Sequence, residues 1–364
     1  MTSTDAPALA PAAGFVPLRV ARVDPLTADS VAVVFEVPPE HAERFGFSPG
    51  QHLTLRRVLD GQDLRRTYSV CSSADGGPLR VAVKRLEGGA LSTWLTTQLR
   101  EGDALEVHPP GGSFGPRLEP GASRRLGLVA AGSGITPVLS IAASVLDLEP
   151  DSDVVLLYGN RSADSVMFVE ELSDLKDRYP QRLQVLHVLS REEQDAELLT
   201  GRIDRDRLLR LARSGLLPVD EVDEWYLCGP FGMVTDAQAA LTELGVPAGR
   251  VHVELFHAGP PPPRPPREGP PQDASVVHVR LHGRSSTLSV DADTQTVLDA
   301  VLLSRPDAPY ACRGGVCGTC RARLVEGAVE LDVNWALAPD ELAAGVVLTC
   351  QARPTTPEVR LEFL

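Results

Sequence analysis

Residues 312–320 of the chain read CRGGVCGTC, and a fourth cysteine, Cys350, follows further along. The spacing Cys312-x4-Cys317-x2-Cys320 is typical of a plant-type 2Fe-2S site, in which four thiolates hold two iron atoms. The intervening glycines let the backbone curl tightly, so that N–H groups can point at the sulfurs. The four cysteines are therefore the predicted cluster ligands.

Other roles for these cysteines fit the pattern less well. A zinc ribbon would need two C-x2-C knuckles, and the chain has one. Disulfides are disfavoured in the cytoplasm, where we expect this protein, and inert thiols are the remaining alternative. Two further cysteines, Cys71 and Cys228, stand alone.

The cysteines belong to a C-terminal segment, residues 274–364, whose strand-like runs and single helical run predict a compact α+β domain. Its resemblance to plant-type ferredoxins, carried by the cysteine spacing, implies a β-grasp fold. A proline-rich stretch precedes it: eight of the fifteen residues in 259–273 are proline. Such a stretch favours extended polyproline II and should act as a semi-rigid linker, on which the cluster domain could move. A ligand for a polyproline-binding domain is the alternative interpretation.

Two different patterns precede the linker. Residues 120–258 alternate apolar strand-like runs with amphipathic helical runs, which predicts an α/β domain with a five-stranded parallel sheet and sites at the carboxyl ends of its strands. Residues 14–119 contain short β-rich runs and one helical run, which predicts an antiparallel β-barrel. The expected architecture is therefore multidomain.

Composition excludes several partners. The 364 residues carry a net charge of -14, which would repel phosphate backbones and anionic membrane surfaces, so we expect no nucleic acid or membrane partner. Residues 126–146 are free of charge over about a membrane-spanning length, but the GSGITP sequence in their middle breaks them into a strand and a helix. The N-terminus has no basic n-region, so a secretory signal is not expected.

A flavin motif is predicted in the barrel. The sequence Arg66-Thr67-Tyr68-Ser69 offers an arginine for phosphate, a ring to stack on the isoalloxazine and a hydroxyl for its reactive nitrogen. The pair Gly88-Gly89 then opens the helical run, where amides and the helix dipole can bind a pyrophosphate. For residues 66–69, the alternative is an ordinary strand with a cross-strand tyrosine.

A nicotinamide nucleotide site is predicted in the α/β domain. Residues 132–137, GSGITP, join its first strand to its first helix, where glycines permit close approach of a pyrophosphate. Pro137 stands where a third glycine would complete the G-x-G-x-x-G fingerprint, and a tight strand–helix turn is the alternative. The sequence Cys228-Gly229-Pro230 follows the fourth strand and would present Cys228 to the nicotinamide; a buried structural cysteine is the other interpretation.

Two strand ends carry candidate groups for coenzyme selection. Arg161 follows the second strand of the sheet, and Ser190-Arg191 follow the third, so both lie at the predicted ligand edge. Guanidinium and hydroxyl groups there could bind the 2′-phosphate that distinguishes NADPH from NADH. Ordinary surface arginines are the alternative.

Together these motifs resemble the ferredoxin-NADP reductase superfamily fused to a plant-type ferredoxin, in the order flavin, nicotinamide, cluster. Within it the chain is most similar to the reductase subunits of bacterial phenylacetyl-CoA epoxidases. The similar segments are LRRTYSV (64–70), AAGSGITP (130–137), LLYGNR (156–161), DLKDRYPQRLQ (174–184), TGRID (200–204), YLCGPFGM (226–233) and PDELAAGVVLTCQA (339–352).

The resemblance implies residue roles. Ser69, Cys228 and Glu254 would act at the reacting rings, and Phe256 would close the reductase module beside the flavin. FAD would be the flavin, since a GGxxS-type turn is present. The full set of implied cofactor-binding residues is Arg66, Tyr68, Ser69, Val83, Lys84, Gly89, Ala90, Leu91, Ser92, Gly132, Ser133, Gly134, Thr136, Pro137, Arg161, Ser190, Arg191, Cys228, Gly229 and Pro230.

The resemblance also implies the activity. Electrons would pass from NADPH to FAD, to the 2Fe-2S cluster and on to the di-iron oxygenase subunits of a multicomponent epoxidase in phenylacetate catabolism. A reductase for a Rieske-type ring- or ketosteroid-hydroxylating oxygenase is the main alternative. A non-enzymatic redox sensor is a further one.

Overall fold

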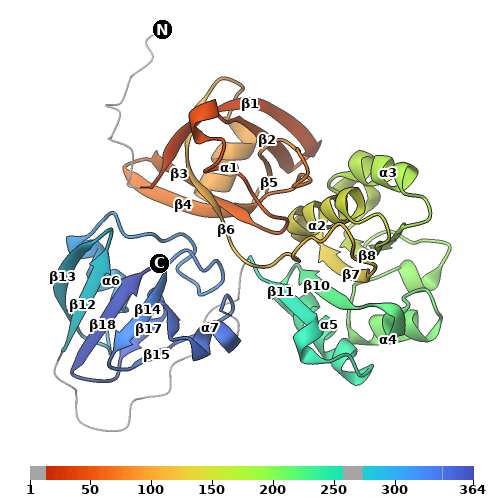
Figure 1. Cartoon of the computed structure of the whole chain (residues 1–364). Coiled ribbons are helices and arrows are strands. Elements are labelled where there is room, and N and C mark those ends of the chain that lie inside the picture. The colour runs from red at the N-terminus through yellow and green to blue at the C-terminus, as the bar shows by residue number, and fades with distance from the viewer. Residues whose placement is uncertain (1–13, 257–273, 338) are drawn as a thin grey trace.

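The computed structural model describes residues 14–256, 274–337 and 339–364, which form three units, each built on its own sheet (Figure 1). The sequence-predicted linker, residues 259–273, lies outside the described residues. Within the described part of the chain, no helix is both long and apolar enough to cross a membrane.

The first unit is a curled six-stranded antiparallel sheet. A single bridge, Val70 to Val81, links the chain beyond one edge strand to the other edge strand, so the sheet curls toward closure. The edge strand that carries the predicted flavin motif starts at a hairpin turn in which Asp60 and Gly61 both have positive φ. The strand order is β4-β3-β6-β1-β2-β5, with β1 (Val16–Thr27), β2 (Ser30–Glu36), β3 (His52–Leu59), β4 (Gln62–Ser69), β5 (Arg80–Lys84), β6 (Ala104–Gly111) and the helix α1 (Ala90–Thr97).

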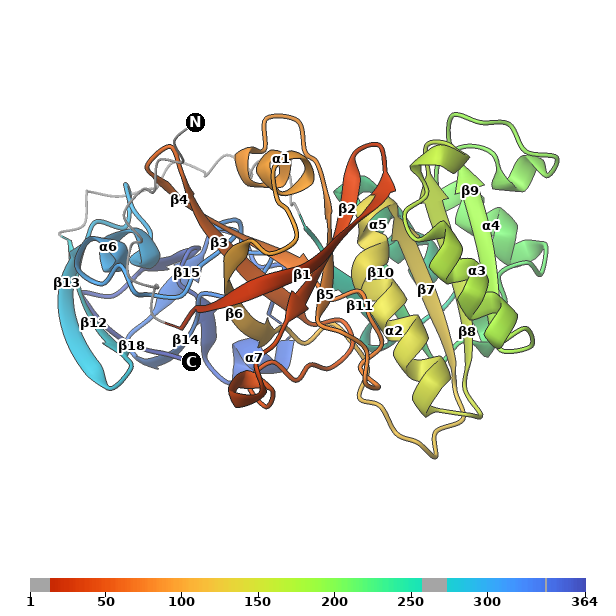
Figure 2. The same ribbon diagram turned by 90° about the horizontal axis from the view of Figure 1, so that it is seen from above.

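The second unit confirms the predicted five-stranded parallel sheet. Its order is β11-β10-β7-β8-β9, so the connection direction reverses beside β7, where open α/β sheets bind ligands. Helices α2 and α3 cover one face and α4 and α5 the other (Figure 2), which explains why the strands are almost continuously apolar. The elements are β7 (Arg125–Ala131), β8 (Asp153–Asn160), β9 (Leu183–Leu189), β10 (Glu224–Cys228), β11 (Val251–Glu254), α2 (Ile135–Leu148), α3 (Val169–Arg178), α4 (Arg205–Arg213) and α5 (Phe231–Glu243).

The third unit is α+β, as predicted. A mixed five-stranded sheet of order β13-β12-β18-β14-β16 packs against α6, whose capping box joins Thr296 and Asp299. A small sheet of β15 and β17 lies beside it. The bounds are β12 (Ser275–Leu281), β13 (Arg284–Val290), β14 (Arg321–Glu326), β15 (Val329–Leu331), β16 (Val346–Leu348), β17 (Ala352–Pro354), β18 (Glu358–Phe363), α6 (Val297–Ser304) and α7 (Pro339–Ala343).

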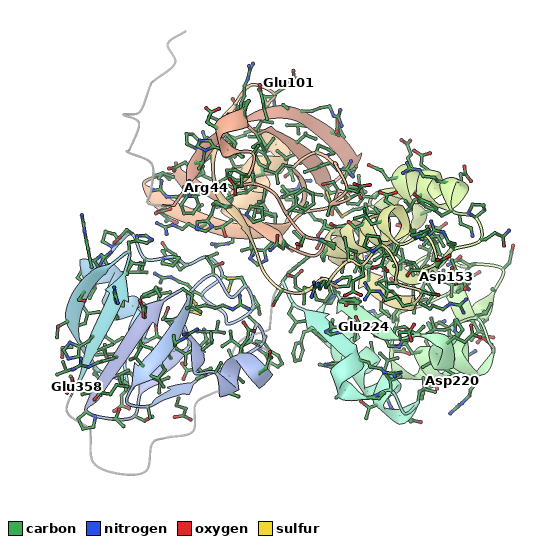
Figure 3. The ribbon with its side chains drawn as sticks, in the orientation of Figure 1. Arg44, Glu101, Asp153, Asp220, Glu224 and Glu358 are labelled. Atoms are coloured by element: carbon green, nitrogen blue, oxygen red, sulfur yellow. The ribbon has the colours of Figure 1, made fainter. Side chains whose placement is uncertain are left out.

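Short 3-10 helices complete the structure, at Pro39–His41, Gly132–Gly134, Ala163–Ser165, Glu197–Leu199, Val219–Glu221 and Ala248–Arg250. The charged side chains of Glu101, Asp220 and Glu358 lie at the outer surface of the first, second and third unit respectively (Figure 3).

A buried ion pair stabilises the second unit. Glu149 follows α2 and is fully buried; its carboxylate accepts hydrogen bonds from Arg124 Nε (3.0 Å) and Nη2 (2.6 Å), from Ser152 Oγ (2.8 Å) and from the backbone N–H of Glu119 (3.0 Å). Burial alone would raise the pKa of Glu149, but the hydrogen bonds from Arg124 and Glu119 lower it below its ordinary value. The group therefore contributes stability above its unfolded-state pKa and loses that contribution as the pH falls through its folded-state pKa.

We expect Glu149→Gln to lower the free energy of unfolding by about 2 kcal/mol at neutral pH, because the mostly buried Arg124 loses its counter-charge. Urea denaturation followed by circular dichroism measures the change. The control is Glu243→Gln, which breaks an exposed ion pair with Arg205 and should change little. An equal loss of stability at pH 7 and at a pH below the folded-state pKa of Glu149 would contradict this account.

Candidate functional site

Three strand ends meet between the first and second units. Ser69, the last residue of β4, donates a hydrogen bond from its Oγ to Glu254 Oε2 at 3.2 Å. Glu254 ends β11 and pairs in register with Cys228, the last residue of β10. The structure thus brings together the three residues predicted to act at the reacting rings.

The Cys228 thiol is fully buried at this junction. Burial, and secondarily the negative charge of Glu254, raise the pKa of Cys228 well above its ordinary value, so the thiol is protonated at neutral pH. It therefore cannot act as a thiolate nucleophile and can only shape the site or donate a weak hydrogen bond.

The predicted glycine loop lies at the carboxyl end of β7 and leads into α2. At Gly134 an added Cβ would lie 2.0 Å from the backbone oxygen of Cys228, so only glycine lets α2 start this close to β10. Gly132 has a φ of +54°, which favours glycine. Thr136 is buried and donates from its Oγ1 to Ser133 O at 3.0 Å, which closes the turn. The turn leaves the N-terminus of a 14-residue helix at the sheet's ligand edge, where an anion would be stabilised.

A second turn lies on the barrel, at the start of α1. Gly89 is the N-cap residue, and the Ser92 hydroxyl accepts from Leu86 N and donates to Gly89 O, both at 3.1 Å. Leu91 and Val83 are buried in the barrel core, while Lys84 pairs with Asp29 at 3.3 Å. The side chains of Ser92, Leu91 and Val83 are therefore committed to the fold, and the backbone groups of residues 89–92 are what this turn can offer a pyrophosphate.

Arg66 and Tyr68 of the predicted flavin motif lie on β4. Arg66 is exposed and donates from Nη1 to Arg65 O at 2.7 Å, and Tyr68 packs partly against the barrel core. Since side chains alternate along a strand, Arg66 and Tyr68 share one face and Ser69 lies on the other.

The groups predicted to select the coenzyme also come together. The backbone N–H of Ser190 bonds to Asn160 O at 2.9 Å, and that of Arg191 bonds to Arg161 O at 2.7 Å, so the ends of β8 and β9 are held side by side. Both arginine side chains are exposed at this edge. Two guanidinium groups on adjacent strand ends have the charge and the donors that a phosphate group requires.

The four predicted cluster ligands form two pairs, Cys312 with Cys317 and Cys320 with Cys350. The hydrogen bond from the Cys317 thiol lowers the pKa of Cys312 to about 5, against the effect of burial. The backbone N–H of Gly314 also points at Cys312 Sγ, at 3.3 Å. Among the described residues, no three metal-binding side chains converge on a point for one ion. Two thiol pairs suit a two-iron cluster, in which each iron takes two cysteines, better than a single zinc ion.

Each of the three units matches a known domain family. Residues 17–115 match the oxidoreductase FAD-binding domain, residues 128–239 the oxidoreductase NAD-binding domain, and residues 279–355 the 2Fe-2S iron-sulfur cluster binding domain. The chain belongs to the ferredoxin-NADP reductase superfamily, in the group with a C-terminal 2Fe-2S domain.

Curated relatives match nearly the full length of this reductase. It is 45% identical to one of the subunits of the 1,2-phenylacetyl-CoA epoxidase of Escherichia coli, over 96% of this chain and 98% of the relative. It is 38% identical to the 3-ketosteroid-9-alpha-monooxygenase ferredoxin reductase component of Rhodococcus rhodochrous, over 95% and 96% of the two chains. The fold matches that of phthalate dioxygenase reductase with a TM-score of 0.58 and 24% identity, over 96% and 98% of the chains.

The reductase is therefore an NAD(P)H-dependent oxidoreductase with FAD-, NAD- and 2Fe-2S-binding domains. The observed donor sets fit these groups: paired thiols with inward backbone N–H groups for the cluster, and glycine turns at helix N-termini for the two pyrophosphates. Relatives in the group are reductase components that serve separate oxygenase components.

Three polar residues of the site were missed by sequence reasoning. His52 Nδ1 lies 3.8 Å from Glu254 Oε1. Asn160 is buried at the end of β8, at the edge that carries Arg161. Gln351 donates from Nε2 to Cys350 Sγ at 3.5 Å and to Arg313 O at 2.9 Å. Two of the three had a signal in the sequence: Gln351 directly follows a cluster cysteine, and Asn160 lies in the LLYGNR segment directly before Arg161.

Proposed function

We propose that this reductase uses NADPH to supply electrons to the di-iron oxygenase of a phenylacetyl-CoA epoxidase in the cytoplasm. The full-length similarity to a component of a phenylacetyl-CoA epoxidase, at higher identity than to the ketosteroid monooxygenase reductases, supports this partner. When bound, FAD would supply two-electron hydride acceptance from NADPH and one-electron release, and a 2Fe-2S cluster held by the four cysteines would supply single-electron transfer to the acceptor.

We assign the three functions to residues 14–119 for FAD, 120–258 for NADPH and 274–364 for the cluster. In this assignment Cys312, Cys317, Cys320 and Cys350 hold the iron, and Gly89 and Gly134 open the two helices that receive the pyrophosphates. Each helix start offers first-turn backbone N–H groups and a positive dipole end, which is the chemistry that a pyrophosphate needs.

Ser69, Cys228 and Glu254 would orient the reacting rings. Their strand ends converge, so one planar ring bound on the barrel and one bound on the α/β sheet would meet beside them. The Glu254 carboxylate fixes the Ser69 hydroxyl through the 3.2 Å hydrogen bond, and the protonated Cys228 adds bulk without charge. The contribution of these residues is positioning, which lowers the entropic cost of hydride transfer.

Stopped-flow absorbance tests the whole proposal. On mixing with NADPH, the flavin band should bleach first and the cluster band second. Reoxidation should then require both the di-iron oxygenase component and phenylacetyl-CoA. Bleaching without that reoxidation would contradict the epoxidase partner and favour a ketosteroid- or ring-hydroxylating oxygenase. Absence of bleaching would contradict electron transfer and favour a redox sensor.

Arg191→Ala tests coenzyme selection. We expect the KM for NADPH to rise about tenfold and the KM for NADH to stay nearly constant, because only NADPH carries the 2′-phosphate that a guanidinium would bind. Steady-state reduction of ferricyanide measures both constants. Arg178→Ala, which removes a surface arginine of α3, is the matched control. Equal changes in the two KM values would remove Arg191 from the phosphate site.

A further inference from the structure

Arg65 is buried although its side chain lies on the face of β4 that points away from the barrel core. On β4 its neighbour Leu64 and the later Tyr68 pack against the barrel core. Side chains alternate along a strand, so Arg65 points away from that core. It is nevertheless only 4% exposed. Something outside the barrel core must therefore cover it.

The 2Fe-2S domain supplies part of this cover, through the cysteine loop, residues 308–320. Arg65 Nη1 donates to Ala308 O at 3.4 Å, and the guanidinium carbon lies 4.4 Å from the centroid of the Tyr310 ring. Phe15 of the barrel covers another side, at 5.4 Å. These are contacts between segments 243 residues apart in sequence, and Tyr310 precedes the first cluster cysteine by two residues.

The charge of Arg65 is balanced within the barrel. Its Nη2 donates to Asp63 Oδ2 at 3.0 Å. Burial would raise the pKa of Asp63, but hydrogen bonds from Arg65 and Arg56 lower it, so the carboxylate stays ionised at neutral pH. Because the ion pair lies wholly within the barrel, the cysteine loop can leave without stranding an unpaired charge. The contact is therefore suited to repeated formation and release.

The contact lies on the strand that carries the flavin motif. Ser69 is four residues beyond Arg65 and on the same face, a separation of about 13 Å along the strand. Ser69 in turn bonds to Glu254 at the junction of the FAD- and NAD-binding domains. The outer face of β4 thus runs from the cysteine loop to the redox junction.

The NAD-binding domain contacts the same loop from a second direction. Val316, between two cluster cysteines, belongs to the apolar cluster that contains α4 and α5 side chains. Trp335, whose backbone N–H donates to Gly315 O at 3.1 Å, packs edge-on against Phe231 with ring centroids 5.3 Å apart. The cysteine loop is therefore held by the FAD-binding domain on one side and by the NAD-binding domain on another, and the two sets of contacts define one docked position.

We propose that Arg65 and Tyr310 form a docking contact that positions the cysteine loop for electron transfer from the FAD-binding domain to the 2Fe-2S domain. The assignment rests on the proposed function of the reductase and adds to it two positioning residues. Neither residue is oxidised or reduced: the two electrons of one hydride still leave singly through the cluster. The guanidinium is needed because it stacks on the ring and donates to Ala308 O at the same time.

The test uses the full-length holoprotein and two readouts. In Arg65→Ala, hydrogen–deuterium exchange of the oxidised protein should become faster at residues 308–313, with flavin and iron contents unchanged. Stopped-flow bleaching of the cluster by NADPH should slow about tenfold, while bleaching of the flavin keeps its rate, since a buried cation–π contact and a charge-assisted hydrogen bond are lost together.

Variants separate docking from folding. Tyr310→Phe keeps the ring and should behave as wild type, whereas Tyr310→Leu should reproduce Arg65→Ala. The double variant Arg65→Ala/Tyr310→Leu should be no slower than either single variant, because both remove the same contact. Arg57→Ala is the matched control, since Arg57 stacks on Trp94 within the barrel, at 3.8 Å.

Wild-type exchange and cluster-reduction rates in Arg65→Ala would overturn the docking role. Slower cluster reduction with unchanged exchange at 308–313 would overturn it too, because the loop would still be held. Failure of the proposed function looks different: the wild-type cluster would not bleach with NADPH at all, while the exchange comparison would still report whether Arg65 holds the loop.

Discussion

Cys320→Ser is expected to abolish the 2Fe-2S cluster, and with it NADPH-driven reduction of the oxygenase. Cys320 pairs with Cys350 in a buried site, and a hydroxyl is a far poorer iron ligand than a thiolate. Iron analysis and visible absorbance measure the loss. Reduction of ferricyanide through the FAD-binding domain should continue, because the residues proposed for the flavin and nucleotide sites lie outside the cysteine loop.

The matched control for this change is Cys71→Ser. Cys71 is a buried thiol of the barrel that contacts Arg80 O at 3.4 Å and takes no part in the cysteine pairs. Its replacement should leave the iron content at two atoms per chain, as a 2Fe-2S cluster requires. Full iron content in Cys320→Ser would show that the cluster has other ligands.

Gly134→Ala is expected to lower the free energy of unfolding of the NAD-binding domain by about 3 kcal/mol. The new methyl group would lie 2.0 Å from Cys228 O, a backbone atom that cannot rotate away. Either α2 or the end of β10 must shift, and both belong to the proposed nicotinamide site. Thermal or urea denaturation measures the stability, and the KM for NADPH should rise in parallel.

Gly232→Ala makes the same chemical change two residues beyond Pro230. Gly232 lies in the first turn of α5, and an added Cβ there meets no atom within 4 Å. We expect stability equal to or slightly above wild type, because alanine favours helix. If the two variants were equally stable, close packing at Gly134 would not explain the glycine.

The local motifs of this protein could be predicted from the sequence because their information is local. The spacing of the cysteines limits how one loop can fold around two metal ions, so Cys312, Cys317 and Cys320 needed no tertiary context. The alternation of buried strands with amphipathic helices similarly indicated a parallel sheet, and the sheet then dictated that Arg161 and Arg191 share one edge.

Contacts between distant segments could not be predicted in this way. The position of His52 beside Glu254 depends on how the barrel packs against β11. The burial of Asn160 likewise depends on how the α/β domain packs around the end of β8. Burial is likewise a property of the folded domain: the side chains of Val83 and Leu91, both in the predicted cofactor-binding set, lie in the barrel core.

The groups that this reductase carries are specified in the linear sequence, because the cluster, flavin and nucleotide motifs each depend on a few residues close together in the chain. How these groups are brought together is specified by the packing of the folded domains. Ser69 meets Glu254 across 185 residues, and Arg65 meets Ala308 across 243. Such contacts arise between whole domains, whose complementary surfaces leave no periodic pattern in the sequence.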